Sequence, residues 1–67
     1  MAPIERVAMR LKRLRQAKGW SQRDLAERSG VSREYIARLE TSRQDPSLTI
    51  LEKLANALSV KIEALVR

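Results

Sequence analysis

The residues best suited to chemistry in this 67-residue chain are its arginines and lysines, which are concentrated in its first two-thirds. Residues 1–43 hold 11 of the 14 basic residues and 5 of the 8 acidic ones, so the whole net charge of +6 lies there. A basic segment beside a neutral one suits binding to a phosphate backbone, because each neutralised phosphate releases condensed counterions. The alternative is an ordinary charged surface in water.

Groups that usually perform catalysis are missing from the chain. It has no histidine, no cysteine and no glycine-rich phosphate loop, which removes disulfides and the usual zinc ligands and makes an active site hard to build. The expected second and third helices contain four carboxylates among their arginines: Asp24, Glu27, Glu34 and Glu40. Helix caps and ion pairs are simpler roles for them than catalysis. We therefore expect no enzyme activity, no cofactor and no metal.

Apolar residues at helical spacing predict an all-α fold that positions these charges. The first helix runs from Ile4 to a stop at Lys18-Gly19, where glycine suits the left-handed C′ position. Ser21 and Asp24, three residues apart, predict the start of a second helix over residues 22–28, because their spacing is that of a capping box.

A third helix is predicted from Arg33 through Glu40, with Ser32 as its N-cap. Its inward face would be Ile36 and Leu39. Only about three or four residues around Gly30 separate it from the second helix. A connection that short makes two helices cross steeply, as in a helix-turn-helix.

The rest of the chain predicts a second wall of the core. Residues 41–46 are polar and end in a proline, so they form a loop. A fourth helix follows, capped by Ser47 or Thr49, and its inward residues are Leu48, Leu51, Leu54, Ala55 and Leu58. A fifth helix is expected from Lys61 to Val66. The chain has no repeat or linker, so residues 1–67 form a single small domain.

The run SQRDLAERSGVSREYIARLE at residues 21–40 resembles the phage-repressor and Cro-like helix-turn-helix family, also called the xenobiotic-response-element type. The likeness continues through residues 46–48 and 54–60. It implies a compact five-helix bundle of the lambda-repressor-like type. It also implies a sequence-specific transcriptional regulator that binds double-stranded DNA, a repressor or autoregulator acting on an inverted repeat as a homodimer.

The resemblance places the third helix in the major groove of DNA. Its exposed positions would then read base edges: Arg33, Glu34, Ala37 and Arg38. Arginine can bind O6 and N7 of guanine, glutamate can accept from the cytosine amino group, and the alanine methyl can contact the thymine methyl. Solvent or phosphate is the alternative for the arginines, and an ion pair with Arg38 is the alternative for Glu34.

Other residues are expected by resemblance to contact phosphates. Gln22 would do so from the start of the second helix, or else brace the third helix. Arg23, Thr41 and Arg43 are further phosphate candidates. Tyr35 would either place its hydroxyl on a phosphate or cover the packing between the second and third helices.

Two structural features are also implied by the family. Arg15 and Glu40 match positions that form an internal ion pair between the first helix and the end of the third. The chain departs from the family at Ser42 and Ser59, near turns that often contain glycine or asparagine. A positive φ is strained for a residue other than glycine, so the resemblance does not fix the backbone course or the phosphate contacts of the turns at Thr41-Ser42 and Ser59.

Partner binding is expected at the C-terminal end. Ile62, Leu65 and Val66 would pair two copies so that their third helices meet major grooves about 34 Å apart, or they complete the monomer core. A protein partner such as a toxin is the alternative, because antitoxins and accessory domains share this fold. Basic residues interrupt every apolar run in residues 1–17, so we expect no membrane segment and a cytoplasmic, nucleoid-associated protein of bacterial or phage type.

Overall fold

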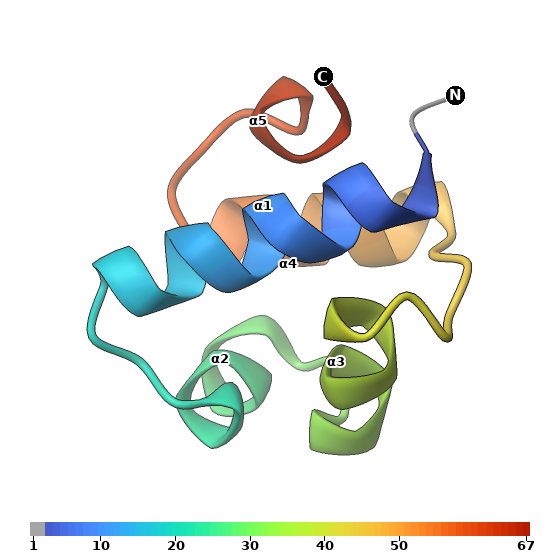
Figure 1. Cartoon of the computed structure of the whole chain (residues 1–67). Coiled ribbons are helices and arrows are strands. Elements are labelled where there is room, and N and C mark those ends of the chain that lie inside the picture. Colours follow the sequence, from blue (N-terminus) through green and yellow to red (C-terminus); the bar gives the residue numbers. More distant parts are fainter. Residues whose placement is uncertain (1–2) are drawn as a thin grey trace.

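Five helices make up most of residues 3–67, the part of the chain that this computed structural model describes. They are α1 (Ile4–Ala17), α2 (Gln22–Ser29), α3 (Arg33–Glu40), α4 (Leu48–Ala57) and α5 (Glu63–Val66) (Figure 1). The predicted all-α fold is confirmed, although residues 1 and 2 of the expected domain lie outside the described residues. None of the helices in residues 3–67 has both the length and the apolar character needed to cross a membrane.

Serine side chains start three of the helices. The hydroxyls of Ser21, Ser32 and Ser47 each accept a hydrogen bond from the backbone N–H three residues later, at 3.0, 3.1 and 3.1 Å. Each bond satisfies one of the N–H groups that a helix start leaves without a partner. The fourth helix is therefore capped by Ser47 and not by Thr49, and its first helical residue is Leu48.

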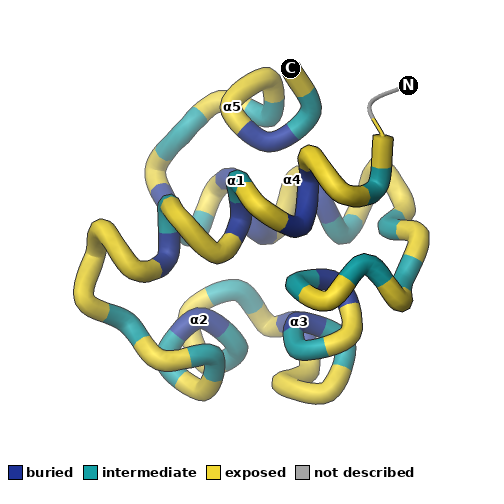
Figure 2. The backbone as a smooth tube through the Cα atoms, viewed as in Figure 1, coloured by how far each residue is buried: buried dark blue, intermediate teal, exposed yellow. Residues whose placement is uncertain are grey.

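The core is aliphatic and lies where all five helices meet. Figure 1 shows α4 behind α1, with α2 and α3 on one side of this pair and α5 on the other. Figure 2 shows that the buried positions face the centre. The side chains with the least exposure come from every helix or its flanking turn: Leu11, Leu25, Ile36, Leu39, Leu54, Leu58 and Leu65.

Two of the sequence predictions for the C-terminal half were wrong. Leu48 was expected in the core but is 66% exposed, because it occupies the first turn of α4 at the edge of the bundle. The fifth helix begins at Glu63 and not at Lys61, and it spans only four residues. No side chain caps its start, so the turn at residues 58–62 extends further than expected.

The two turns whose backbone course the resemblance left open both place a serine in the left-handed region. Ser42 has a φ of 61° and Ser59 a φ of 58°, beside Gly19 and Gly30 at 74° and 76°. For a residue with a Cβ this left-handed region costs roughly 1–2 kcal/mol. The protein therefore carries strain immediately after α3 and after α4.

A buried polar network joins α1, the start of α2 and the end of α3. The guanidinium of Arg15 donates hydrogen bonds to both carboxylate oxygens of Glu40, with Nε–Oε2 at 2.7 Å and Nη2–Oε1 at 2.9 Å. Its Nη1 donates to the backbone carbonyl of Trp20 at 2.6 Å, and Nε2 of Gln22 donates to Oε1 of Glu40 at 3.1 Å. The expected ion pair is thus present, and its hydrogen bond to Glu40 raises the pKa of Arg15.

Replacing Glu40 by alanine should lower the free energy of unfolding by about 3–5 kcal/mol, because Arg15 would be left as a buried charge without its partner. The side chains are only 9% and 2% exposed, so water cannot take over the role of the carboxylate. Thermal unfolding followed by circular dichroism measures the effect, at about 4–8 °C for each kcal/mol.

Glu27→Ala is the matched control for that substitution. Glu27 faces Arg23 at 3.8 Å in a pair whose side chains are 70% and 75% exposed, and its loss should cost no more than about 1 kcal/mol. If Glu40→Ala melted at the same temperature as Glu27→Ala, the buried pair would not be a stabilising element.

The capping box of α2 predicts a pH dependence of stability. The Asp24 carboxylate accepts from the backbone N–H of Ser21 at 2.9 Å, and this bond, followed by the hydrogen bond with the Ser21 hydroxyl, lowers the pKa of Asp24. The stability gained is present above the carboxyl's unfolded pKa and is lost as pH falls through its lower folded pKa. Urea unfolding of wild type and Asp24→Asn should differ by a constant amount above about pH 5, and the difference should disappear only as the pH falls through the lowered folded pKa of Asp24. A difference that does not change with pH would show that the charge of Asp24 adds nothing to the cap.

Candidate nucleic-acid interface

The outer side of α3 presents three charged side chains. Arg33, Glu34 and Arg38 are exposed, while Ile36 and Leu39 on the opposite side are fully buried. Ala37 is half-buried, so less of its methyl group is accessible than the sequence analysis assumed. Burial of one side of the helix fixes which side chains the other side turns to solvent.

The connection between α2 and α3 fixes how α3 is presented. It consists of residues 30–32, with Gly30 at a φ of 76°. Val31 is 4% exposed, and its N–H donates to the hydroxyl of Ser29 at 3.1 Å. The turn is therefore anchored in the core, and Figure 1 shows α2 and α3 together on the side of the molecule away from α5.

Arg38 has a different partner from the one considered in the sequence analysis. Within residues 3–67, Glu34 forms no ion pair with it. Instead, Nε of Arg38 donates to Oε1 of Gln44 at 3.2 Å. No sequence pattern marks Gln44, because the contact depends on how the loop after α3 folds.

The expected phosphate contacts fall into two groups. Arg23 and Arg43 are exposed, and Arg23 faces Glu27 at 3.8 Å in a pair open to water. Gln22 is half-buried and braces Glu40 at the end of α3, which is one of the two roles considered for it. The Thr41 hydroxyl donates to the carbonyls of Ala37 and Arg38, at 3.0 and 3.1 Å, so its one proton is used at the end of α3.

The two aromatic residues serve packing. Tyr35 is half-buried against the core, which agrees with its covering role in the sequence analysis. Trp20 lies under two cations, with the Arg28 guanidinium 4.4 Å and the Lys18 ammonium 5.5 Å from the ring centroid. The Arg28 contact connects the turn before α2 to the last turn of that helix, and the sequence analysis missed both contacts.

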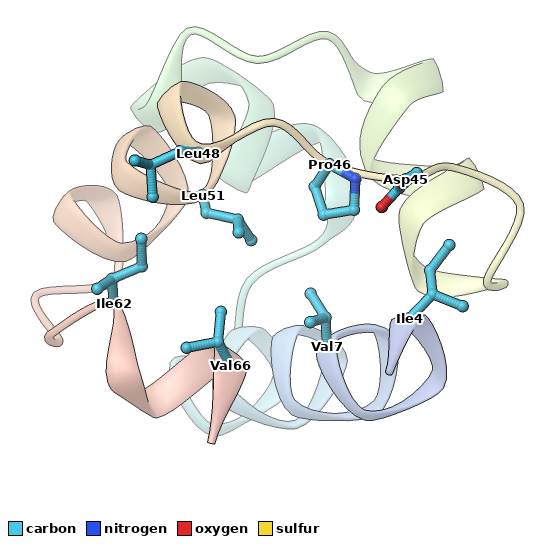
Figure 3. A pocket seen from close by; sticks show the side chains of 8 residues that line it. All are labelled: Ile4, Val7, Asp45, Pro46, Leu48, Leu51, Ile62 and Val66. Atoms are coloured by element: carbon cyan, nitrogen blue, oxygen red, sulfur yellow. The ribbon is translucent and has the colours of Figure 1, made fainter. Parts of the chain in front are cut away.

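An apolar groove of about 460 Å³ opens between the starts of α1 and α4 and the short α5 (Figure 3). Ile62 and Val66 line it together with the exposed Leu48. Leu65, the third residue expected at a dimer interface, is fully buried and completes the monomer core. Because its side chain is fully buried, Leu65 is not accessible to a partner in this structure.

The chain is similar to regulators of known sequence. A family model described as helix-turn-helix matches residues 11–65. The immunity repressor protein of Bacillus phage phi105 is 40% identical over 60 residues, which are 90% of this chain and 42% of the repressor. The transcriptional regulator SinR of Bacillus subtilis is 37% identical over 60 residues, covering 88% of this chain and 54% of SinR. The chain thus spans about half the length of these curated relatives.

Solved structures have the same arrangement of helices. The restriction-modification controller protein C.AhdI from Aeromonas hydrophila has a TM-score of 0.89 and 39% identity, over 92% of this chain and 94% of the controller. The hypothetical transcription factor NHTF from Neisseria has a TM-score of 0.93 and 34% identity, over 97% and 75%. Sequence and structure agree that the chain belongs to the Cro/C1-type helix-turn-helix family, whose members are transcription regulators and not enzymes.

Proposed function

We propose that this chain binds double-stranded DNA sequence-specifically, as a transcriptional repressor or autoregulator. The observation that carries the proposal is the outer side of α3, where Arg33, Glu34 and Arg38 stand exposed on a helix whose other side is anchored in the core. An α-helix fits the major groove. The similarity to a phage immunity repressor and to SinR supports a regulatory role.

Each kind of accessible side chain on α3 is suited to a different base. Arg33 and Arg38 are suited to guanine, whose O6 and N7 accept two hydrogen bonds from one guanidinium. Glu34 has no ion-pair partner within residues 3–67, which leaves its carboxylate free to accept from a cytosine amino group. Ala37 contributes only the accessible part of its methyl group, against a thymine.

Phosphate contacts flank this helix and fix its register on the duplex. Arg23 on α2 and Arg43 in the loop after α3 are exposed cations that precede and follow this helix along the chain. Gln22 sits at the start of α2, where free N–H groups favour an anion, and one of its amide protons remains available. Thr41 and Tyr35 are the weakest candidates for a phosphate contact. The hydroxyl proton of Thr41 is already donated to a backbone carbonyl, and Tyr35 is half-buried.

We further propose that two copies pair through the apolar groove and bind an inverted repeat. Ile62 and Val66 line the groove, and Leu48 at its edge is 66% exposed, an apolar surface that a second copy would remove from water. Pairing at this groove, which adjoins α5, would leave both copies of α3 free to enter successive major grooves, about 34 Å apart.

A selection from randomised duplexes, followed by affinity measurements against salt, tests the proposed function. We expect a short inverted repeat bound at least about a thousandfold more tightly than scrambled DNA. Binding that is sensitive to salt but blind to sequence would contradict the proposal and favour a protein-interaction role instead.

Arg38→Ala should weaken binding to the selected duplex by roughly 1–3 kcal/mol and relax the preference at one base pair. The reason is that a forked contact to guanine is lost at that position alone. Competition binding with duplexes substituted at each base pair measures both effects. An equal loss on every sequence would reduce Arg38 to a phosphate contact.

Arg43→Ala is the matched comparison, because it removes an exposed arginine from the loop after α3. It should weaken all duplexes alike and reduce the slope of log affinity against log salt by about 1. A slope identical to that of the wild type would remove Arg43 from the interface.

Leu48→Lys should shift the protein from dimer to monomer with little change in melting temperature, because Leu48 is exposed in the monomer and would be buried only in the pair. Analytical ultracentrifugation, with and without the selected duplex, measures the change. Met9→Lys is the control, since Met9 on α1 is 52% exposed and does not line the groove. If both variants remained dimeric, the groove would not be the interface.

A further inference from the structure

The loop after α3, residues 41–47, folds back over the end of that helix. The backbone N–H groups of Thr41 and Arg43 both donate to the carbonyl of Arg38, at 3.2 and 2.8 Å. Between them Ser42 takes a φ of 61°, which reverses the direction of the chain. The reversal brings Gln44, six residues along, back beside the side chain of Arg38.

The contact between Gln44 and Arg38 has a defined direction. Oε1 of Gln44 accepts from Nε of Arg38 at 3.2 Å, while its Nε2 faces the carbonyl of Asp45 at 3.5 Å. The amide is therefore oriented with its oxygen toward the guanidinium. Gln44 is half-buried whereas Arg38 is exposed, so the glutamine is the more fixed member of the pair.

We infer that Gln44 is a positioning residue that holds Arg38 ready to read a base, an inference that rests on the proposed DNA-binding function. A guanidinium carries five N–H donors in a rigid planar fork. The bond through Nε uses one of them and leaves both terminal nitrogens for O6 and N7 of a guanine. Fixing the plane of the fork before binding reduces the side-chain entropy that is lost on binding.

The neutrality of Gln44 is part of this role. A carboxylate at the same place would form an ion pair with the guanidinium and repel the DNA backbone. Glu34, one turn earlier on α3, makes no such pair with Arg38 within residues 3–67. The orientation of Arg38 is thus set by an uncharged acceptor, which leaves its full charge for DNA.

The contact can be tested first in the free protein. The order parameter of the Arg38 Nε–H group, measured by NMR and assigned with Arg38→Lys, should fall in Gln44→Ala. It should not fall in Gln16→Ala, which removes an exposed glutamine from α1. Melting temperatures of both variants should match the wild type. An unchanged order parameter in Gln44→Ala would overturn the inference.

The second arm uses the duplex that the wild type selects. Gln44→Ala should weaken binding about 3- to 30-fold, lose discrimination at the base pair that Arg38→Ala affects, and leave the salt slope unchanged. It should add no further loss in the Arg38→Ala background. Equal losses in both backgrounds, or on all sequences, would overturn the positioning role.

The two arms separate this inference from the proposed function. If the wild type selects no sequence, the proposed function fails, and with it the base-reading role of Gln44, whatever the NMR result. If the wild type selects a sequence and Gln44→Ala binds it equally well, only the present inference fails.

Discussion

The ion pair between Arg15 and Glu40 is the constraint on which the arrangement of the other parts depends. It is formed between the end of α1 and the end of α3, and it also takes in the carbonyl of Trp20 and the amide of Gln22. Two charges withdrawn from water are tolerated only where every remaining donor and acceptor is satisfied. No buried side-chain nitrogen or oxygen in residues 3–67 lacks a partner. The pair therefore ties the end of α3 to the end of α1, in addition to the aliphatic contacts between them.

The short α3 can present a recognition surface because one side of it is buried in the core and the other side is exposed to solvent. Ile36 and Leu39 enter the core and cannot rotate out without exposing it. Arg33 and Arg38 are then held on the outside by the same geometry. The cap from Ser32 at one end and the ion pair of Glu40 at the other leave eight residues whose orientation is determined along their whole length.

Charged and apolar surfaces are separated by the bundle. Helix α3 lies on one side of α1 and α4 and α5 on the other (Figure 1), and the groove lined by Ile62 and Val66 adjoins α5, with Asp45 and Pro46 of the loop after α3 at its edge. Association of two copies at the groove would thus leave α3 uncovered. The separation is consistent with the uneven charge of the sequence, whose last third is neutral and supplies most of the groove.

The sequence by itself determined the features that depend on near neighbours along the chain. Helical spacing of apolar residues predicted the first four helices, and a serine before each of α2, α3 and α4 predicted a cap there, because a cap hydrogen bond spans only three residues. Resemblance added the Arg15–Glu40 pair. Tertiary structure alone decided that Leu65 is interior and Leu48 is not, since both satisfy the same periodicity and only the position of neighbouring helices separates them. It also decided that Gln44 contacts Arg38 and that Arg28 lies over Trp20. These pairs are six and eight residues apart, and whether they meet depends on how the chain folds back in three dimensions.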